Sequence, residues 1–103
     1  MAQIVWTEPA VLDLREIAEY IALDKPSAAK GLVKKVFSTV KRLKTFPDSG
    51  REPPELPGSP YRVLIVGPCR VFYRQAGKRV VVLYVMCSER ALRRYILTDR
   101  EIS

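Results

Sequence analysis

Residues 60–97 carry the clearest secondary-structure signals of the sequence: PYRVLIVGPCRVFYRQAGKRVVVLYVMCSERALRRYIL. Two turn signals, Gly67-Pro68 and Ala76-Gly77, divide this stretch into three short runs rich in β-branched and aromatic residues. These runs predict strands over 60–66, 69–75 and 79–87. The third run is apolar on both faces, so it should be a central strand. Ser88 can cap a short helix over 89–97.

The first half of the chain predicts helices that support this sheet. Residues 3–7 form a short β-type run, and Thr7 can cap a helix that ends near Leu23. Pro26 then opens a second helix, and because the connection is short the two helices should form an antiparallel hairpin. Apolar residues recur at helical spacing in both segments, and these stripes should face the core: Val11, Leu14, Ile17, Ala18 and Ile21, then Ala29, Leu32, Val33, Val36, Phe37, Val40 and Leu43.

A loop over 48–60 connects the second helix to the sheet, since its four prolines and two glycines exclude regular structure. The prediction is one α+β domain over residues 1–103: an N-terminal strand, an antiparallel helical hairpin packed on a small, mainly antiparallel sheet, and a short C-terminal helix. No apolar run is long enough to span a bilayer, and the N-terminus lacks the features of a secretory signal. We therefore expect a cytoplasmic protein with no membrane partner.

The composition limits the chemistry that the chain can perform. With no histidine and two cysteines, it offers neither a histidine general base nor the usual ligands of zinc, so we expect no metal and no cofactor. The net charge of +7 is concentrated: residues 25–46 carry seven basic and no acidic groups, and residues 60–97 carry eight basic groups against Glu89 alone. Such surfaces attract polyanions, although a lysine-rich helix face is also a common solvated surface.

The arginines of the strands are the candidate binding residues. Arg70 and Arg74 lie four residues apart in the middle strand, an even spacing that places them on one face of the sheet. Guanidinium groups bind carboxylates and phosphates through two parallel hydrogen bonds, which favours an acidic or phosphate-rich partner. The alternative is that Arg70 supports the sheet by pairing with a loop carboxylate, Glu52 or Glu55.

The cysteines and the tyrosines of this region are interpreted as structural residues. Cys69 and Cys87 should be reduced, small and buried. If Gln75 and Lys78 close the last hairpin, Cys69 faces Tyr84, and a disulfide with Cys87 is out of register. Three tyrosines fit core-edge aromatics whose hydroxyls reach water: Tyr73, Tyr84 and Tyr95.

The order of these features resembles the RelE/ParE superfamily, the toxins of bacterial type II toxin–antitoxin systems. Three pieces carry the resemblance: Thr7-Glu8-Pro9-Ala10 before Asp13-Leu14-Arg15-Glu16-Ile17, then Phe46-Pro47 before Gly50-Arg51, and Arg62-Val63-Leu64-Ile65-Val66-Gly67 before Arg70-Val71-Phe72-Tyr73-Arg74. The resemblance covers nearly the whole chain. It implies growth inhibition, a role in plasmid stabilisation, and a cognate antitoxin whose C-terminal segment lies over an apolar groove of the hairpin and sheet, with its acids on the arginines.

The superfamily divides by target, and the sequence can be compared with both branches. RelE-type members cut messenger RNA on the ribosome. If the chain is an enzyme, it is a metal-independent endoribonuclease of this kind, and the resemblance assigns catalysis to Arg70, Arg90 and Tyr95. The paired lysines of that branch are represented at best by Arg62, because residues 64–66 are apolar.

ParE-type members are thought to poison DNA gyrase, and the chain resembles this branch more closely in the length of the hairpin and around Gly50-Arg51. Cys87 departs from it, since many of these sequences have histidine there, followed by an arginine that Arg90 represents. We favour a gyrase-directed toxin, with a RelE-like nuclease and a non-catalytic nucleic-acid-binding module as alternatives. A homodimer and a toxin–antitoxin hetero-oligomer both stay open. The expected target- or antitoxin-binding residues are Arg62, Arg70, Arg74, Arg90, Arg93 and Arg94.

Overall fold

The chain folds into a helical hairpin on a mixed sheet with a C-terminal helix. The computed structural model describes residues 1–102, with side chains for residues 1–96. Its elements are β1 (Gln3–Trp6), α1 (Glu8–Ala22), α2 (Pro26–Lys41), the 3-10 helix η1 (Arg42–Lys44), β2 (Tyr61–Val66), β3 (Cys69–Ala76), β4 (Arg79–Cys87) and α3 (Glu89–Ile102). Within these residues the sheet has the order β1-β4-β3-β2. β1 is parallel to β4, and the other pairs are antiparallel. The predicted α+β architecture and the central position of β4 are confirmed, and α3 extends further than predicted.

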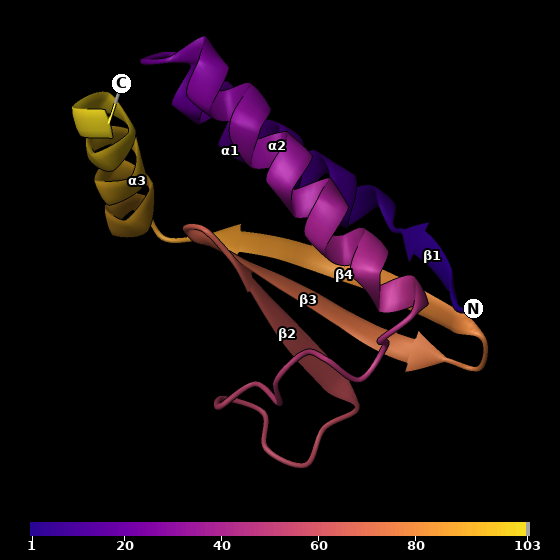
Figure 1. Cartoon of the computed structure of the whole chain (residues 1–103). Coiled ribbons are helices and arrows are strands. Elements are labelled where there is room, and N and C mark those ends of the chain that lie inside the picture. Colours follow the sequence, from indigo (N-terminus) through magenta and orange to yellow (C-terminus); the bar gives the residue numbers. More distant parts are fainter. Residues whose placement is uncertain (103) are drawn as a thin grey trace.

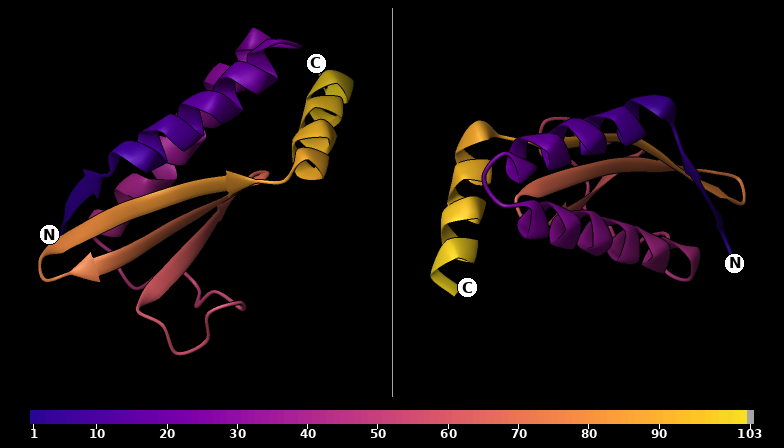
Figure 2. Two further views of the ribbon diagram at one scale, coloured as in Figure 1. Left: turned by 180° about the vertical axis from the view of Figure 1, so that it is seen from behind. Right: turned by 90° about the horizontal axis from the view of Figure 1, so that it is seen from above.

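The two long helices cover one face of the sheet, side by side and in opposite directions (Figures 1 and 2). The Thr7 hydroxyl begins α1 by accepting a hydrogen bond from Ala10 N at 3.3 Å, and it donates to Val82 O at 2.8 Å. One turn later, Asp13 Oδ2 accepts a hydrogen bond from Val85 N at 3.1 Å. The start of α1 is therefore fixed to β4 by two side chains as well as by packing.

The core lies between the helical hairpin and the sheet and is mainly aliphatic. Two residues expected there are largely exposed, Val11 at 47% and Phe37 at 46%, because they lie at the margins of the apolar stripes. The Phe37 ring packs on Trp6 instead, with ring centroids 4.8 Å apart. Large residues with essentially no exposure include Ile21, Leu32, Val36, Val40, Leu43, Val66, Val71, Tyr73, Val80 and Val82.

In the described part of the chain, none of the helices has the length and apolar character needed to cross a membrane.

The β3–β4 hairpin turns one residue later than the sequence predicted. Ala76 pairs with Arg79, so the turn residues are Gly77 and Lys78. Gly77 has a φ of 62°, a left-handed conformation that glycine adopts without steric penalty, and this suits the first position of a two-residue turn. The predicted closing pair of Gln75 with Lys78 is therefore wrong.

A β-bulge between Phe72 and Tyr73 shifts the pairing of the same two strands once more. The later turn and the bulge together place Cys69 opposite Cys87 instead of Tyr84. The prediction that the two cysteines are out of register is therefore wrong. Both thiols are free; Cys69 is fully buried and Cys87 is partly buried.

Candidate functional site

The face of the sheet opposite the helical hairpin carries exposed apolar and basic side chains. Ile65, Arg70 and Met86 are cross-strand partners in one row, and Phe72 and Tyr84 pair in the next. Ile65, Tyr84 and Met86 are exposed by 59%, 52% and 56%. The residues that alternate with them along the strands, such as Val66, Val71 and Val85, are buried in or packed against the core under the hairpin, so this row faces away from it. We call these five residues the open-face patch.

Arg70 is the charged centre of the open-face patch. Its guanidinium lies 5.0 Å from the centroid of the Phe72 ring. It also forms a two-pronged ion pair with Glu55 of the loop, in which Nη1 lies 3.4 Å from Oε2 and Nη2 is in closer contact with Oε1. The hydrogen bond to Arg70 is the main reason that the pKa of Glu55 is lowered. The structure therefore has the contact that the alternative interpretation of Arg70 described, and of its two candidate carboxylates the partner is Glu55.

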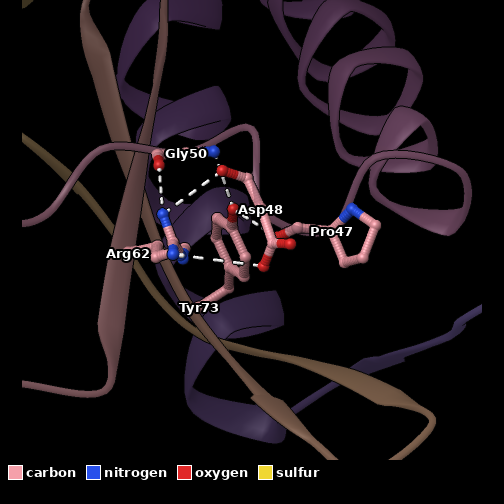
Figure 3. Close-up of polar contacts among 5 residues, drawn as sticks. All are labelled: Pro47, Asp48, Gly50, Arg62 and Tyr73. Carbon is pink, nitrogen blue, oxygen red and sulfur yellow. Dashed lines mark hydrogen bonds and ion pairs between the residues drawn. The ribbon is translucent and has the colours of Figure 1, made fainter.

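A second strand arginine, Arg62, holds the loop on the sheet (Figure 3). Its Nη1 donates to Gly50 O at 2.9 Å and to Asp48 O at 3.2 Å. The Tyr73 hydroxyl donates to Pro47 O at 2.9 Å and accepts from Gly50 N at 2.8 Å. Burial raises the pKa of Tyr73, so the hydroxyl keeps the proton that it donates. We call these five residues the loop anchor, and the prediction that the Tyr73 hydroxyl reaches water is wrong.

The loop anchor requires glycine at position 50. A Cβ built on Gly50 would lie 2.5 Å from Tyr73 Oη and 2.7 Å from Tyr73 Cε1, which is closer than atoms of these types can approach. The next residue, Arg51, forms an isolated antiparallel bridge with Val63, with N···O distances of 2.9 and 2.7 Å. The Gly50-Arg51 motif therefore attaches the loop to the outer edge of β2 and brings Glu55 within reach of Arg70.

α3 stands across one end of the sheet, beside the connection between α1 and α2 (Figure 2). Ser88 caps it as predicted, with Oγ accepting a hydrogen bond from Ala91 N at 3.1 Å. Arg93 donates to Glu89 at 2.7 Å. A hydrogen bond with Tyr20 of α1 is the main cause of a raised pKa of Arg93, and Glu89 adds to it. Arg93 therefore connects α3 to the helical hairpin.

The residues that the RelE-type resemblance assigns to catalysis do not lie on one face. Tyr95 packs against the core, and its Cε1 lies 3.8 Å from the position of a Cβ built on Gly67. Arg70 lies on the opposite face, and Arg90 is exposed in the first turn of α3. The six arginines expected to bind a partner are also divided: Arg70 in the open-face patch, Arg62 in the loop anchor, Arg74 exposed further along β3, and Arg90, Arg93 and Arg94 exposed on α3.

The resemblance implied an apolar groove of the hairpin and sheet, but the groove in the structure is lined by residues of the helical hairpin, and none of its lining residues belongs to a strand. The groove has a volume of about 1020 Å³ and is mainly apolar. Alanine and glycine residues of both helices are among its lining, and small residues at helical spacing are the signal that could have located it. We call it the hairpin groove. Its apolar lining includes Ala18, Ala22, Ala29, Val33 and Phe37, and its charged lining consists of Arg15, Glu19, Lys30, Lys34 and Lys41 over the described side chains.

The helical hairpin on one face of the sheet, the open-face patch with Arg70 on the other and the anchored loop at the edge of β2 match the arrangement expected of a toxin domain of the RelE/ParE type. Residues 4–92 match the family described as the ParE toxin of the type II toxin–antitoxin system parDE. The chain is 35% identical over 68 residues to Toxin RelE2 of Caulobacter vibrioides, an alignment that covers 66% of this chain and 73% of that protein.

A solved structure agrees with the family match. A chain of the chromosomal ParDE system from P. aeruginosa superposes with a TM-score of 0.71 and 29% sequence identity, covering 86% of this chain and 98% of that one. The chain belongs to the ParE toxin family. It is the toxin component of a type II toxin–antitoxin system, and membership of this family implies a cognate antitoxin as its partner.

Proposed function

We propose that this toxin inhibits growth in the cytoplasm by binding DNA gyrase, and that the open-face patch contacts the target. Arginine and aromatic side chains with exposed aliphatic neighbours are typical of the energetically dominant part of protein interfaces. Arg70 already binds one carboxylate, that of Glu55. Because this carboxylate is 53% exposed, an acidic group of the target can replace it.

The arrangement of the candidate catalytic residues supports binding over RNA cleavage, and this observation carries the choice between the two branches. Cleavage requires charge-stabilising and proton-transferring groups within reach of one phosphate. Tyr95 packs against the core, whereas Arg70 lies on the open face. Arg62, the nearest substitute for the lysines of the nuclease branch, donates to the loop carbonyls. The RelE-like alternative would need these groups to move together.

Induced expression in a bacterial host tests the proposal. The wild-type chain should arrest growth, activate DNA-damage signalling and trap gyrase on DNA. Arg70→Ala should abolish these effects, whereas Arg79→Ala should keep them, because Arg79 is an exposed arginine at the opposite end of β4 from Met86. Cuts in messenger RNA within translated frames, without trapped gyrase, would reject the proposal in favour of the RelE-like nuclease.

We infer further that the antitoxin neutralises the toxin through the hairpin groove, and that the segment it inserts is amphipathic and acidic. The apolar floor provides the surface for the apolar side of such a segment. Four of the five charged lining residues are basic, namely Arg15, Lys30, Lys34 and Lys41, against the single acid Glu19. This imbalance favours carboxylates on the margins of the bound segment and speeds its association.

Two adjacent lysines of α2 provide a matched test of antitoxin binding. Lys34 lines the hairpin groove and Lys35 does not, although both are exposed. Lys34→Glu should weaken the affinity for the purified cognate antitoxin about tenfold, through a slower association rate. Lys35→Glu makes the same change in net charge and should leave the affinity nearly unchanged. Equal losses in both variants would show that net charge, and not the groove, determines the affinity.

A further inference from the structure

Cys69 and Cys87 form a facing pair of thiols that the proposed function does not use. Cys69 begins β3, Cys87 ends β4, and the two are cross-strand partners. The β-bulge creates this pair. Without it, counting seven residues back from Ala76 and seven forward from its partner Arg79 would place Cys69 opposite Met86, whose side chain belongs to the open face. The fold therefore brings the two sulfurs to the same side of the sheet.

The backbone geometry of this pair suits a covalent bond between the sulfurs. Directly opposed residues of an antiparallel pair have Cα atoms about 4.5–5.5 Å apart, and disulfides form at Cα separations of about 4.4–6.8 Å. The Cys87 thiol donates to Pro68 O, with Sγ 3.0 Å from the oxygen. The two thiols are near enough for each to affect the pKa of the other. Paired strands at this separation can hold a disulfide, and the Cys87 side chain must turn away from Pro68 O to form it.

The two thiols differ in their exposure, which sets the order in which they can react. Cys69 has no exposed surface, and burial together with the neighbouring Cys87 raises its pKa to about 12. Burial raises the pKa of Cys87 as well, so both are protonated thiols at neutral pH and react slowly. Cys87 is partly exposed, and a dissolved oxidant reaches it first.

We propose that Cys69 and Cys87 are a dithiol–disulfide site that a peroxide oxidises within one chain. The Cys87 sulfur, after losing its proton, attacks one oxygen of hydrogen peroxide. The O–O bond breaks, and the products are a sulfenic acid on Cys87 and water. The Cys69 sulfur then displaces the hydroxyl group from Cys87, which forms the S–S bond and releases a second water. Two thiols and one peroxide thus become one disulfide and two waters.

The disulfide would cross-link the start of β3 to the end of β4, just before α3 begins. Cys69 precedes Arg70, and Cys87 precedes Ser88, the cap of α3. The bond would connect these two positions and remove the hydrogen bond from Cys87 to Pro68 O. Since a cross-link restricts the unfolded chain, the melting temperature of the oxidised protein should rise by roughly 10 °C.

Oxidation of the purified full-length chain with hydrogen peroxide tests the site. Both free thiols should disappear together, the mass should fall by two hydrogen atoms, and a peptide map should show the two cysteines joined within one chain. A reductant should restore both thiols and the original melting temperature. The Cys87→Ser variant should leave Cys69 unreactive, and the Cys69→Ala variant should form a sulfenic acid on Cys87.

Three results would overturn the proposal. In the first, both thiols of the folded chain remain free at a peroxide concentration that oxidises the urea-unfolded chain. The second is a disulfide between chains, and the third is further oxidation of Cys87 while Cys69 stays a thiol. All three are measured on the wild-type protein, so they do not depend on the folding of the variants, which circular dichroism checks separately.

Discussion

The loop anchor and the open-face patch each place a strand arginine beside the same loop, but the partners of the two arginines differ. Arg62 donates to the backbone carbonyls of Gly50 and Asp48, which cannot leave without unfolding the loop. Arg70 pairs with the exposed side chain of Glu55, which a carboxylate or phosphate of another molecule can replace. We infer that the partner, and not the residue type or the motif, distinguishes an arginine that maintains the fold from one that can bind another molecule.

The largest effect is expected where the loop anchor is most tightly packed. Gly50→Ala places a methyl group 2.5 Å from Tyr73 Oη, so the loop must move and its hydrogen bonds to Tyr73 must break. We expect a loss of about 3 kcal/mol in the free energy of unfolding, from overpacking and from unpaired buried groups. Urea denaturation measures this loss.

Gly31→Ala is the control for this substitution. Gly31 lies inside α2, and a Cβ built on it has no neighbour within 4 Å. Alanine has the higher helix propensity, so this variant should gain about 1 kcal/mol. If Gly50→Ala were as stable as Gly31→Ala, the loop would not be anchored through Tyr73.

A smaller effect is expected from removing one hydroxyl of the loop anchor. Tyr73→Phe leaves the ring in place but deprives Pro47 O of its donor and Gly50 N of its acceptor. We expect a loss of about 2 kcal/mol, measured by thermal or urea denaturation. Tyr84→Phe is the matched control, since Tyr84 is 52% exposed, and its stability should not change. Equal stability of the two variants would contradict a structural role for the Tyr73 hydroxyl.

The sequence predicted the elements well where the signals are local. The Gly67-Pro68 turn, the Thr7 and Ser88 caps and the proline-rich loop each depend on a few neighbouring residues, and the structure has them close to the predicted positions. The α+β architecture followed from their order. The last turn was misplaced by one residue because Ala76-Gly77 and Gly77-Lys78 are both acceptable turn sequences.

The features that sequence reasoning missed depend on contacts between distant residues. The β-bulge arises from the fit of β3 to β4 and has no local signal, so the facing cysteines could not be predicted. The bond from Tyr73 to Pro47 spans 26 positions in the chain. Arg70 had two candidate carboxylates, Glu52 and Glu55, and the course of the loop decided between them. The candidate site was therefore predicted as a set of arginines but not as two groups with different partners.

The smallest effect is expected from substituting Glu55, the residue that pairs with Arg70 of the open-face patch. Glu55→Gln removes the charge that pairs with Arg70 and should raise the salt concentration needed to elute the protein from heparin. Glu52→Gln changes the same charge in the same loop, but Glu52 accepts a hydrogen bond from Gly58 N. Its elution should shift less. An equal shift in both variants would indicate that only the net charge matters.

The ion pair between Glu55 and Arg70 also predicts a pH dependence. Because Arg70 lowers the pKa of Glu55 from its ordinary value of 4.5, the pair is present at and above that pH. It is lost as the pH falls through the lowered pKa. The difference in stability between the wild-type chain and Glu55→Gln should be small at neutral pH and should disappear in acid, as melting temperatures across the pH range will show.

We propose that Arg62 maintains the fold while Arg70 binds the target, and melting temperature and toxicity measured on the same two variants test this division of roles. Arg62→Ala should lower the melting temperature by roughly 5–10 °C, through the lost loop hydrogen bonds, and should remain toxic at temperatures where it is folded. Arg70→Ala should melt close to the wild-type chain, since a partly exposed ion pair contributes little, and should no longer arrest growth. A folded Arg70→Ala variant that arrests growth as strongly as the wild type, beside a folded Arg62→Ala variant that does not, would contradict the claim.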